Sequence, residues 1–256
     1  AGFGEPWPEF NDGVYYRDRC AASDAGRMLI EFYAENHGSS APFHGWLQRI
    51  HNKQITVDGN VVTDPHTVLK GVEELVYHRL PWKEPEAPHS IGILYEDDDM
   101  IALNKPSGLQ VLPGGSFQQR TILTQLRRRT ENRVSRCRAT PVHRLGRGTS
   151  GVLLCAKTTR AKSHLAALFA RETSVVETSR HNPAPKETRR ITKLYRALVS
   201  GIILDDEVVI DQPIGVVEYP GVSHGLYVAT PSGKPALSGV MILERNIRSN
   251  STLVQV

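Results

Sequence analysis

The glycine-rich segment GRGTSG at residues 146–151 has the spacing of a phosphate-binding loop. Glycines in the order GxGxxG let a backbone approach a dinucleotide when a strand precedes them, a helix follows, and an acid stands about 20 residues further on. Here the sequence VLLC at 152–155 indicates a strand after the glycines, and positions 165–171 contain no Asp or Glu. A kinase loop is also excluded, because neither HRDxxxxN nor DFG follows. The segment therefore does not predict a nucleotide cofactor.

Other residues that could do chemistry lack the spacing that a site needs. The sequence has no HExxH, P-loop or GxSxG motif, and its ten histidines are scattered. The acidic run at 97–99 lacks the alternating order and the glycine of a calcium loop, so we expect a solvated turn. Three cysteines without CxxC spacing exclude a disulfide scaffold and a cysteine zinc module, and they fit a reducing compartment. These cysteines are Cys20, Cys137 and Cys155.

Basic residues are concentrated in the middle of the chain. Residues 120–171 contain 13 Lys or Arg and one acid, Glu131, whereas the rest of the chain contains 18 bases and 26 acids. This uneven distribution favours a polyanion partner, such as the phosphate backbone of a nucleic acid. For the run Arg127, Arg128 and Arg129 alone, a solvated basic helix face is an equally simple interpretation. Because the same block contains the glycine-rich segment, we favour nucleic acid.

Four stretches of sequence occur together in the order found in one enzyme family. The first is ILYED at 93–97 followed by NKPSGL at 104–109, and the second is PVHRLGRGTSGVLL at 141–154. KLYRALV at 193–199 and KPA at 234–236 complete the set. Together they resemble the RluA-type pseudouridine synthases, which isomerise a uridine within RNA. The resemblance implies RNA as the partner and a reaction that needs neither a cofactor nor a metal.

The resemblance also implies roles for individual residues. Arg144 matches the arginine that occupies the space near the flipped base in the family, and an ordinary phosphate contact is its alternative role. Tyr195 matches the tyrosine that stacks on the uracil and manages its C5 proton, whereas its spacing alone favours a core aromatic. Lys105 and Arg147 join the run 127–129 as expected RNA contacts, and Lys105 is also expected to shape the turn beneath the site.

Position 146 departs from the family pattern. The family has its catalytic aspartate directly after His-Arg-Leu, and this chain has Gly146 there. Glycine supplies no nucleophile, acid or base, and the nearest acids in the sequence are Glu131 and Glu172. Two interpretations stay open: another carboxylate reaches the pocket, or the chain is an RNA-binding relative with impaired catalysis. The family's later GRxHQIR stretch, whose arginine pairs with the aspartate, does not follow residues 252–256, so we expect a truncated C-terminus.

Apolar periodicity predicts the elements that carry these residues. Helical spacing occurs at 25–33, 121–129 and 161–171, and Asp58-Gly59 between two apolar runs predicts a hairpin. Residues 172–192 indicate an exposed insertion. Further strands are expected at 75–80, 91–95, 100–103, 152–156, 194–199, 208–210, 226–229, 236–243 and 253–256. Many strands with few helices predict an α+β fold, which the resemblance makes a pseudouridine-synthase-like mixed or antiparallel sheet with flanking helices.

Pro81, Pro85 and Pro88 indicate a domain boundary. We expect a leader with a short helix over 1–43 that is irregular up to residue 20, and a linker over 83–90. By resemblance, we expect a small S4-like RNA-binding module over 44–82 and the catalytic domain over 91–256. No apolar run reaches 18 residues, so no membrane partner is expected, and the protein is expected to act as a monomer. No clear targeting peptide is visible, so cytoplasm, nucleus and organelles all stay open as locations.

Overall fold

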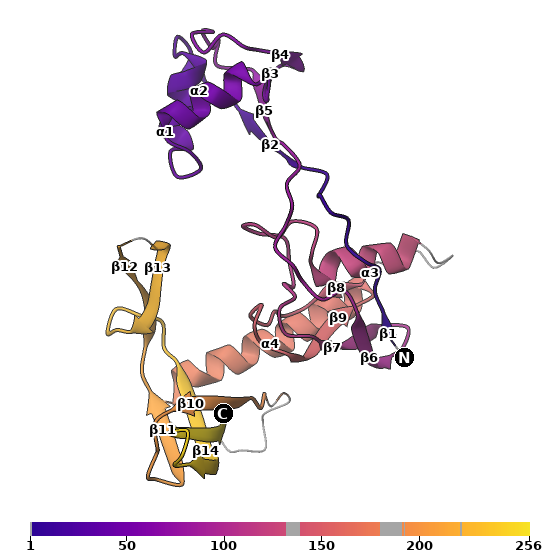
Figure 1. The fold of residues 1–256 in the computed structure, drawn as a ribbon, viewed down its shortest axis with the longest axis vertical. Coiled ribbons are helices and arrows are strands. Elements are labelled where there is room, and N and C mark those ends of the chain that lie inside the picture. The colour runs from indigo at the N-terminus through magenta and orange to yellow at the C-terminus, as the bar shows by residue number, and fades with distance from the viewer. Residues whose placement is uncertain (1, 132–138, 180–190, 192, 221) are drawn as a thin grey trace. The chain divides into compact units, whose positions relative to one another are not determined.

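The computed structural model describes every residue except 1, 132–138, 180–190, 192 and 221, and it describes no side chains at 171–179 and 222–224. The chain forms two compact units, Ala1–Thr158 and Thr159–Val256, and each unit has its own sheets (Figure 1). Among the described helices, none is both long and apolar enough to cross a lipid bilayer.

The N-terminal module of the first unit is a small sheet with two helices. Its strands lie in the order β2-β5-β3-β4, and all pairs are antiparallel. Asp58 and Gly59 have φ values of 48° and 79°, which confirms the tight turn predicted between β3 and β4. The elements are β2 (Val14–Arg19), the short 3-10 helix η1 (Ala22–Asp24), α1 (Leu29–Asn36), α2 (Phe43–His51), β3 (Ile55–Val57), β4 (Asn60–Val61) and β5 (Glu74–Arg79).

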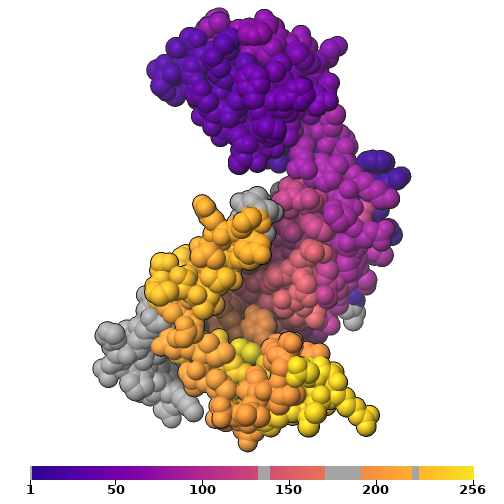
Figure 2. Space-filling view, turned by 60° about the vertical axis from the view of Figure 1, so that its left-hand side comes forward, coloured from indigo at the N-terminus to yellow at the C-terminus, as the bar shows by residue number. Residues whose placement is uncertain are grey.

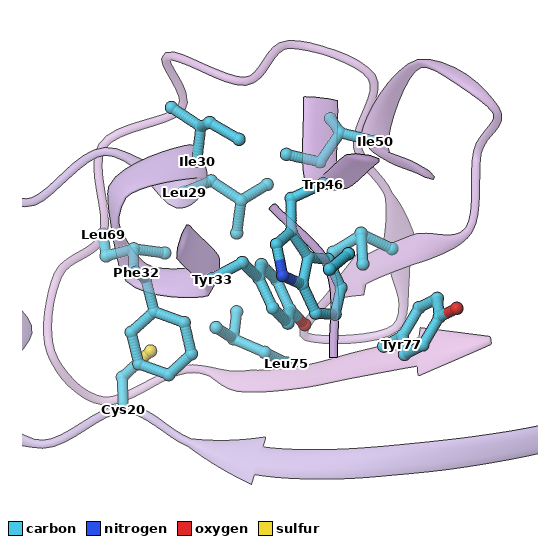
Figure 3. Close-up of a cluster of buried hydrophobic side chains, with 12 residues drawn as sticks. Cys20, Leu29, Ile30, Phe32, Tyr33, Trp46, Ile50, Leu69, Leu75 and Tyr77 are labelled. Atoms are coloured by element: carbon cyan, nitrogen blue, oxygen red, sulfur yellow. The ribbon is translucent and has the colours of Figure 1, made fainter. Parts of the chain in front are cut away.

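This module has one aromatic-rich core (Figure 3). The short helix predicted at 25–33 is α1, whose buried side chains belong to this core. Residues 14–19 form strand β2 of the module's sheet, so the irregular structure predicted for them was wrong. The reason is non-local, because β2 pairs along its whole length with β5, about 60 residues later. In Figure 2 most of the indigo and purple atoms gather into one body. The buried core residues are Cys20, Leu29, Ile30, Phe32, Tyr33, Ala41, Trp46, Ile50, Ile55, Leu69, Leu75 and Tyr77.

A second core in the same unit carries the first two family motifs. Its five-stranded sheet has the order β1-β6-β7-β9-β8, and the 97–99 turn joins β6 to β7 as predicted. The elements are β1 (Gly2–Phe3), β6 (Ile91–Glu96), β7 (Met100–Lys105), α3 (Ile122–Glu131), β8 (Thr140–Pro141) and β9 (Gly151–Ala156). The buried residues are Ile91, Ile101, Leu103, Leu109, Val111, Ile122, Leu126, Ala139, Leu153 and Cys155.

The second unit begins with a long helix and continues in antiparallel strands. The helix extends past the predicted end at 171 and takes up the first residues of the expected insertion, whose residues 180–190 and 192 lie outside the described residues. A four-stranded sheet has the order β10-β15-β14-β11, and β12 and β13 form a separate hairpin. The elements are α4 (Thr159–Ser179), β10 (Arg196–Ser200), β11 (Glu207–Asp211), β12 (Ile214–Tyr219), β13 (Val222–Ala229), β14 (Leu237–Asn246) and β15 (Ser251–Gln255). The predicted α+β class with antiparallel sheets is confirmed.

Candidate active site

Strands β7 and β9 bring the first two family motifs together. The strands pair from Met100 with Ala156 to Lys105 with Gly151, so the segments beyond these ends, 106–109 and 143–150, leave the sheet at the same edge. Two hydrogen bonds then join the segments. The Gly108 amide donates to the Arg147 carbonyl at 2.8 Å, and the Ser107 hydroxyl donates to the Gly148 carbonyl at 2.7 Å. The glycine-rich segment therefore belongs to a pair of loops, 106–109 and 143–150, that hydrogen bonds hold together.

Lys105 lies beneath this loop pair and is fully buried. Its ammonium donates to the carbonyls of Pro106 at 2.9 Å, Leu109 at 2.7 Å and Arg147 at 3.2 Å. Burial, with a smaller effect from the Arg147 charge, lowers the pKa of Lys105 to about 8. The structure agrees with the expected role in shaping the turn. It places Lys105 away from solvent, so the expected RNA contact is replaced by three contacts to the protein's own backbone.

Gly146 occupies the surface of the loop and has room for a side chain. Its carbonyl accepts a hydrogen bond from the Thr149 amide at 3.1 Å. Its φ lies outside the left-handed region, and an added Cβ would meet only Thr149 Oγ1, at 3.4 Å. Gly151 is different, because its φ of 124° is one that other residues rarely adopt. The backbone therefore needs glycine at 151 and does not need it at 146.

Two of the predicted RNA-contacting arginines flank Gly146. Arg144 and Arg147 are both exposed. The Arg147 guanidinium lies 5.2 Å from the centre of the Phe117 ring, a cation–π contact that orients the side chain. The sequence gives no signal for Phe117, because it lies outside the motifs, eight residues after Leu109, and has no periodic spacing of its own. The loop thus presents two cations around a position that lacks a carboxylate.

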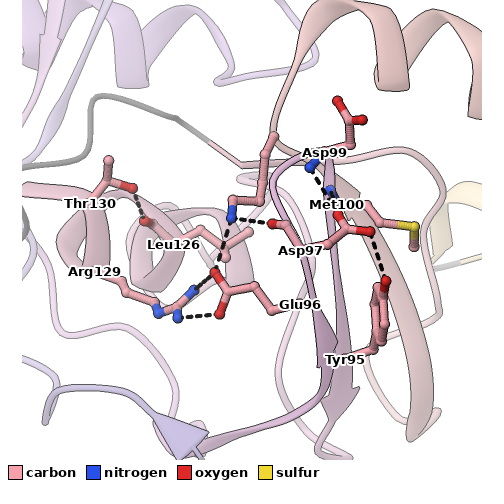
Figure 4. A network of polar contacts seen from close by, with 9 residues as sticks. Tyr95, Glu96, Asp97, Asp99, Met100, Leu126, Arg129 and Thr130 are labelled. Carbon is pink, nitrogen blue, oxygen red and sulfur yellow. Dashed lines mark hydrogen bonds and ion pairs between the residues drawn. The ribbon is translucent and has the colours of Figure 1, made fainter.

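The basic block is divided between structural and exposed arginines. Arg129 forms a bidentate pair with Glu96, with its closer contact at 2.7 Å, and Lys157 reaches the same carboxylate at 3.3 Å (Figure 4). The hydrogen bond from Arg129 is the main reason that the pKa of Glu96 is lowered. Arg128 lies 5.3 Å from the Trp7 ring centre. Within this run only Arg127 is exposed, and Arg128 and Arg129 are partly buried.

Another arginine of the basic block, Arg120, is also bonded within the protein. Arg120 is buried and donates to the carbonyls of Pro85 at 3.3 Å and Pro8 at 3.0 Å. The expectation that the whole block grips a polyanion is therefore too broad, because folding brings acids, rings and carbonyls to several of its members. Four further arginines of the block lie outside the described residues or side chains, namely Arg133, Arg136, Arg138 and Arg171.

Tyr195 lies in the second unit, immediately before β10. Its backbone amide donates to the Val256 carbonyl at 2.8 Å, and the Val256 amide donates back at 2.9 Å. Its side chain is 41% exposed, so the core position suggested by spacing alone is not what the structure shows. Arg144 and Gly146 lie together in the first unit, and Tyr195 is placed only within its own unit. Among the described residues, no group of three His, Cys, Asp or Glu could hold a metal ion.

Comparisons with known proteins agree with the motifs. A family model described as RNA pseudouridylate synthase matches residues 99–256. RNA pseudouridine synthase 5 of Oryza sativa subsp. japonica is 56% identical, and the match covers 99% of this chain and 67% of that protein. Its namesake in Arabidopsis thaliana is also 56% identical, over 99% of this chain and 70% of that protein. An uncharacterized RNA pseudouridine synthase of Synechocystis sp. is 35% identical, and the match covers 85% of this chain and 67% of that protein. This chain belongs to the RNA pseudouridylate synthase family of RluA-type isomerases.

Proposed function

We propose that this protein converts uridine to pseudouridine within RNA. In this isomerisation the N1–C1′ bond breaks, the uracil turns, C5 bonds to C1′, and a proton leaves C5 while N1 gains one. The target nucleotide must first leave its helix, because its glycosidic bond is inaccessible when stacked. One observation carries the proposal. Hydrogen bonds from Lys105, Ser107 and Gly108 hold the two family motifs together, so the loop that carries the arginines has a fixed backbone.

The exposed side chains of this loop suit the handling of a flipped nucleotide. Arg144 is proposed to occupy space near the displaced base, and Arg147 and Arg127 to contact flanking phosphates, where guanidinium groups bind well. Tyr195 is proposed to stack on the uracil and manage the C5 proton, a role that its 41% exposure permits. Lys105 is proposed as a positioning residue, because its ammonium holds the Arg147 carbonyl.

A second candidate function follows from Gly146. Between Glu131 and Glu172 the sequence contains no acid, so the loop carries no carboxylate to replace the family's aspartate. Loss of a central catalytic group commonly costs several orders of magnitude in rate. The alternative is therefore a catalytically impaired relative that binds RNA without modifying it. The family assignment and the high identity to proteins named as synthases favour the enzyme.

The N-terminal module is proposed to be an S4-like RNA-binding module centred on residues 44–82, followed by a linker at 83–90 and the catalytic domain. Two helices on a small sheet with an independent core support this assignment. The protein is also proposed to act as a monomer.

The deciding experiment is to incubate the protein with total RNA and to map pseudouridine chemically at nucleotide resolution. New sites above an enzyme-free control are expected. If none appears while RNA binding is retained, the second candidate function replaces the first. Arg144→Ala serves as the matched variant, since it is expected to remove modification without changing the melting temperature.

A further inference from the structure

The N-terminal module contains a cavity of about 500 Å³ that the catalytic motifs do not use. It lies within the size range of ordinary ligand sites. Its lining comes from β2, β5, α1, α2 and the segment that joins the two helices. The residues that matter for its chemistry are Tyr16, Asp18, Tyr33, His37, Trp46 and Tyr77.

Aromatic rings form a continuous wall of this cavity. Tyr16 on the edge strand β2 stacks on Tyr77 with 5.9 Å between ring centres and 14° between planes. Tyr77 meets Trp46 edge-on at 5.0 Å, and Trp46 stacks on Tyr33 at 4.5 Å. Tyr33 and Trp46 lie close together in Figure 3. Tyr16 is 43% exposed, so the outer end of the wall offers a ring face to a flat ligand.

The inner end of the wall has an unsatisfied polar group. Tyr33 is fully buried, and its hydroxyl has no hydrogen-bond partner among the described residues. Leaving such a group unpaired costs free energy, so it calls for an explanation. Burial, assisted by the charge of Asp18, raises the pKa of Tyr33, so the hydroxyl stays protonated and can donate. Asp18 adds a carboxylate acceptor at the cavity, 3.1 Å from His37 Nε2.

The charge of the module limits what the ligand can be. Residues 11–82 contain seven Lys or Arg and nine Asp or Glu, so this module lacks the positive field that grips a phosphate backbone. One of its cations, Arg49, lies 4.4 Å from the Trp46 ring centre and 4.8 Å from that of Tyr77. Arg17 also lines the cavity, but its guanidinium lies 3.9 Å from the Glu74 carboxylate and 5.3 Å from the Tyr15 ring centre. Stacking and hydrogen bonds to a ring edge are therefore the main interactions that this cavity offers.

We propose that this cavity binds an unpaired nucleobase of the RNA, stacked against Tyr16 and hydrogen-bonded at its edge by Tyr33 and Asp18. The inference rests on the proposed function, because that function makes RNA the ligand. Unstacked bases are commonly recognised on aromatic side chains in this way. The site would hold a nucleotide other than the target uridine, through contacts that do not depend on phosphate charge.

Fluorescence anisotropy with labelled single-stranded RNA octamers tests the proposal. Tyr16→Leu is expected to weaken binding by roughly 10-fold, the effect of losing one stacking ring, while Tyr16→Phe keeps the ring and the affinity. Phe43→Leu is the matched control, because Phe43 is 53% exposed on α2 and does not line the cavity. The slope of log affinity against log salt is expected to be the same for Tyr16→Leu and wild type.

Tyr33→Phe is the second variant and removes only the unpaired hydroxyl. It is expected to leave the melting temperature unchanged or higher and to weaken octamer binding several-fold. If folded Tyr16→Leu and Tyr33→Phe bind as wild type does, the proposal is overturned. Quenching of tryptophan fluorescence by mononucleotides without any effect of the variants on octamer binding would also overturn it, in favour of a small-ligand site. If RNA binding depends on Tyr16 but no pseudouridine is formed, the proposed enzyme function is refuted and the base-binding site is not.

Discussion

At the scale of single residues, the loop around Gly146 separates two reasons for having glycine. Gly151 has a φ of 124°, a conformation that side chains rarely tolerate. Gly146 has a φ outside the left-handed region, and an added Cβ there would meet only Thr149 Oγ1, at 3.4 Å. The backbone conformation therefore does not explain why position 146 lacks a carboxylate, and the loop has room for an aspartate side chain there.

Gly146→Asp is expected to fold with a melting temperature within a few degrees of wild type. If the absent carboxylate alone limits the rate, pseudouridine formation by the variant exceeds that of wild type. A fast wild type that is slowed by this substitution would show that another acid has the role, and alanine substitution of each acid would then identify it.

Lys105→Met is expected to destabilise the first unit by about 2 kcal/mol, because buried carbonyls lose their donor. Pseudouridine formation is expected to fall as well, since the Arg147 carbonyl is no longer held. Urea denaturation measures the stability, with Lys162→Met, an exposed lysine of α4, as the control. Equal stability of the two variants would show that the ammonium does not hold the loop.

At the scale of elements, the proline-rich segment between the two cores is firmly attached. Glu84 is 2% exposed and accepts hydrogen bonds from the Asn11 side chain at 2.9 Å and from the amides of residues 118, 119 and 120 at 2.8–2.9 Å. The Trp7 indole donates to the Ala87 carbonyl at 2.9 Å. One buried carboxylate therefore joins three segments that are remote in the sequence.

Glu84→Gln is expected to lower the free energy of unfolding by about 3 kcal/mol at pH 7, because an amide cannot accept all these bonds. Burial alone would raise the pKa of Glu84, but the hydrogen bonds outweigh it and lower the pKa below 4.5. The carboxylate's contribution is thus present above pH 4.5 and is lost as the pH falls below it. Denaturation at several pH values checks this, and a difference between wild type and variant that stays constant down to pH 3 would contradict it.

At the scale of the whole molecule, charge has two separate uses. The net charge of +4 conceals a basic block whose members partly hold the first unit together and partly face solvent. Arg120, Arg129 and Lys157 belong to the first group, and Arg127, Arg144 and Arg147 to the second. Of these six residues, only those of the second group should therefore contribute to the salt dependence of RNA binding.

Arg127→Ala and Arg129→Ala form a matched pair that tests this division. Arg127→Ala is expected to reduce the slope of log affinity against log salt by about 1 and to leave stability unchanged. Arg129→Ala is expected to lower stability by about 1 kcal/mol, since it removes the pair with Glu96, with little change in the salt slope. Anisotropy titrations at several salt concentrations and thermal melting measure both quantities, and identical behaviour of the two variants would refute the division.

The sequence by itself determined the family, the order of the motifs, the α+β class and the turns at 58–59 and 97–99. These features depend on residue types and short spacings, which local chemistry controls. Only the tertiary structure decided that Lys105 is buried, that Arg129 is paired, that Tyr195 is half-exposed and that residues 14–19 form a strand paired with β5. Each of these features depends on a residue about 30 to 60 positions away in the sequence, or on which side of a sheet is buried. No short window of sequence contains that information, because chain folding brings the partner to the residue.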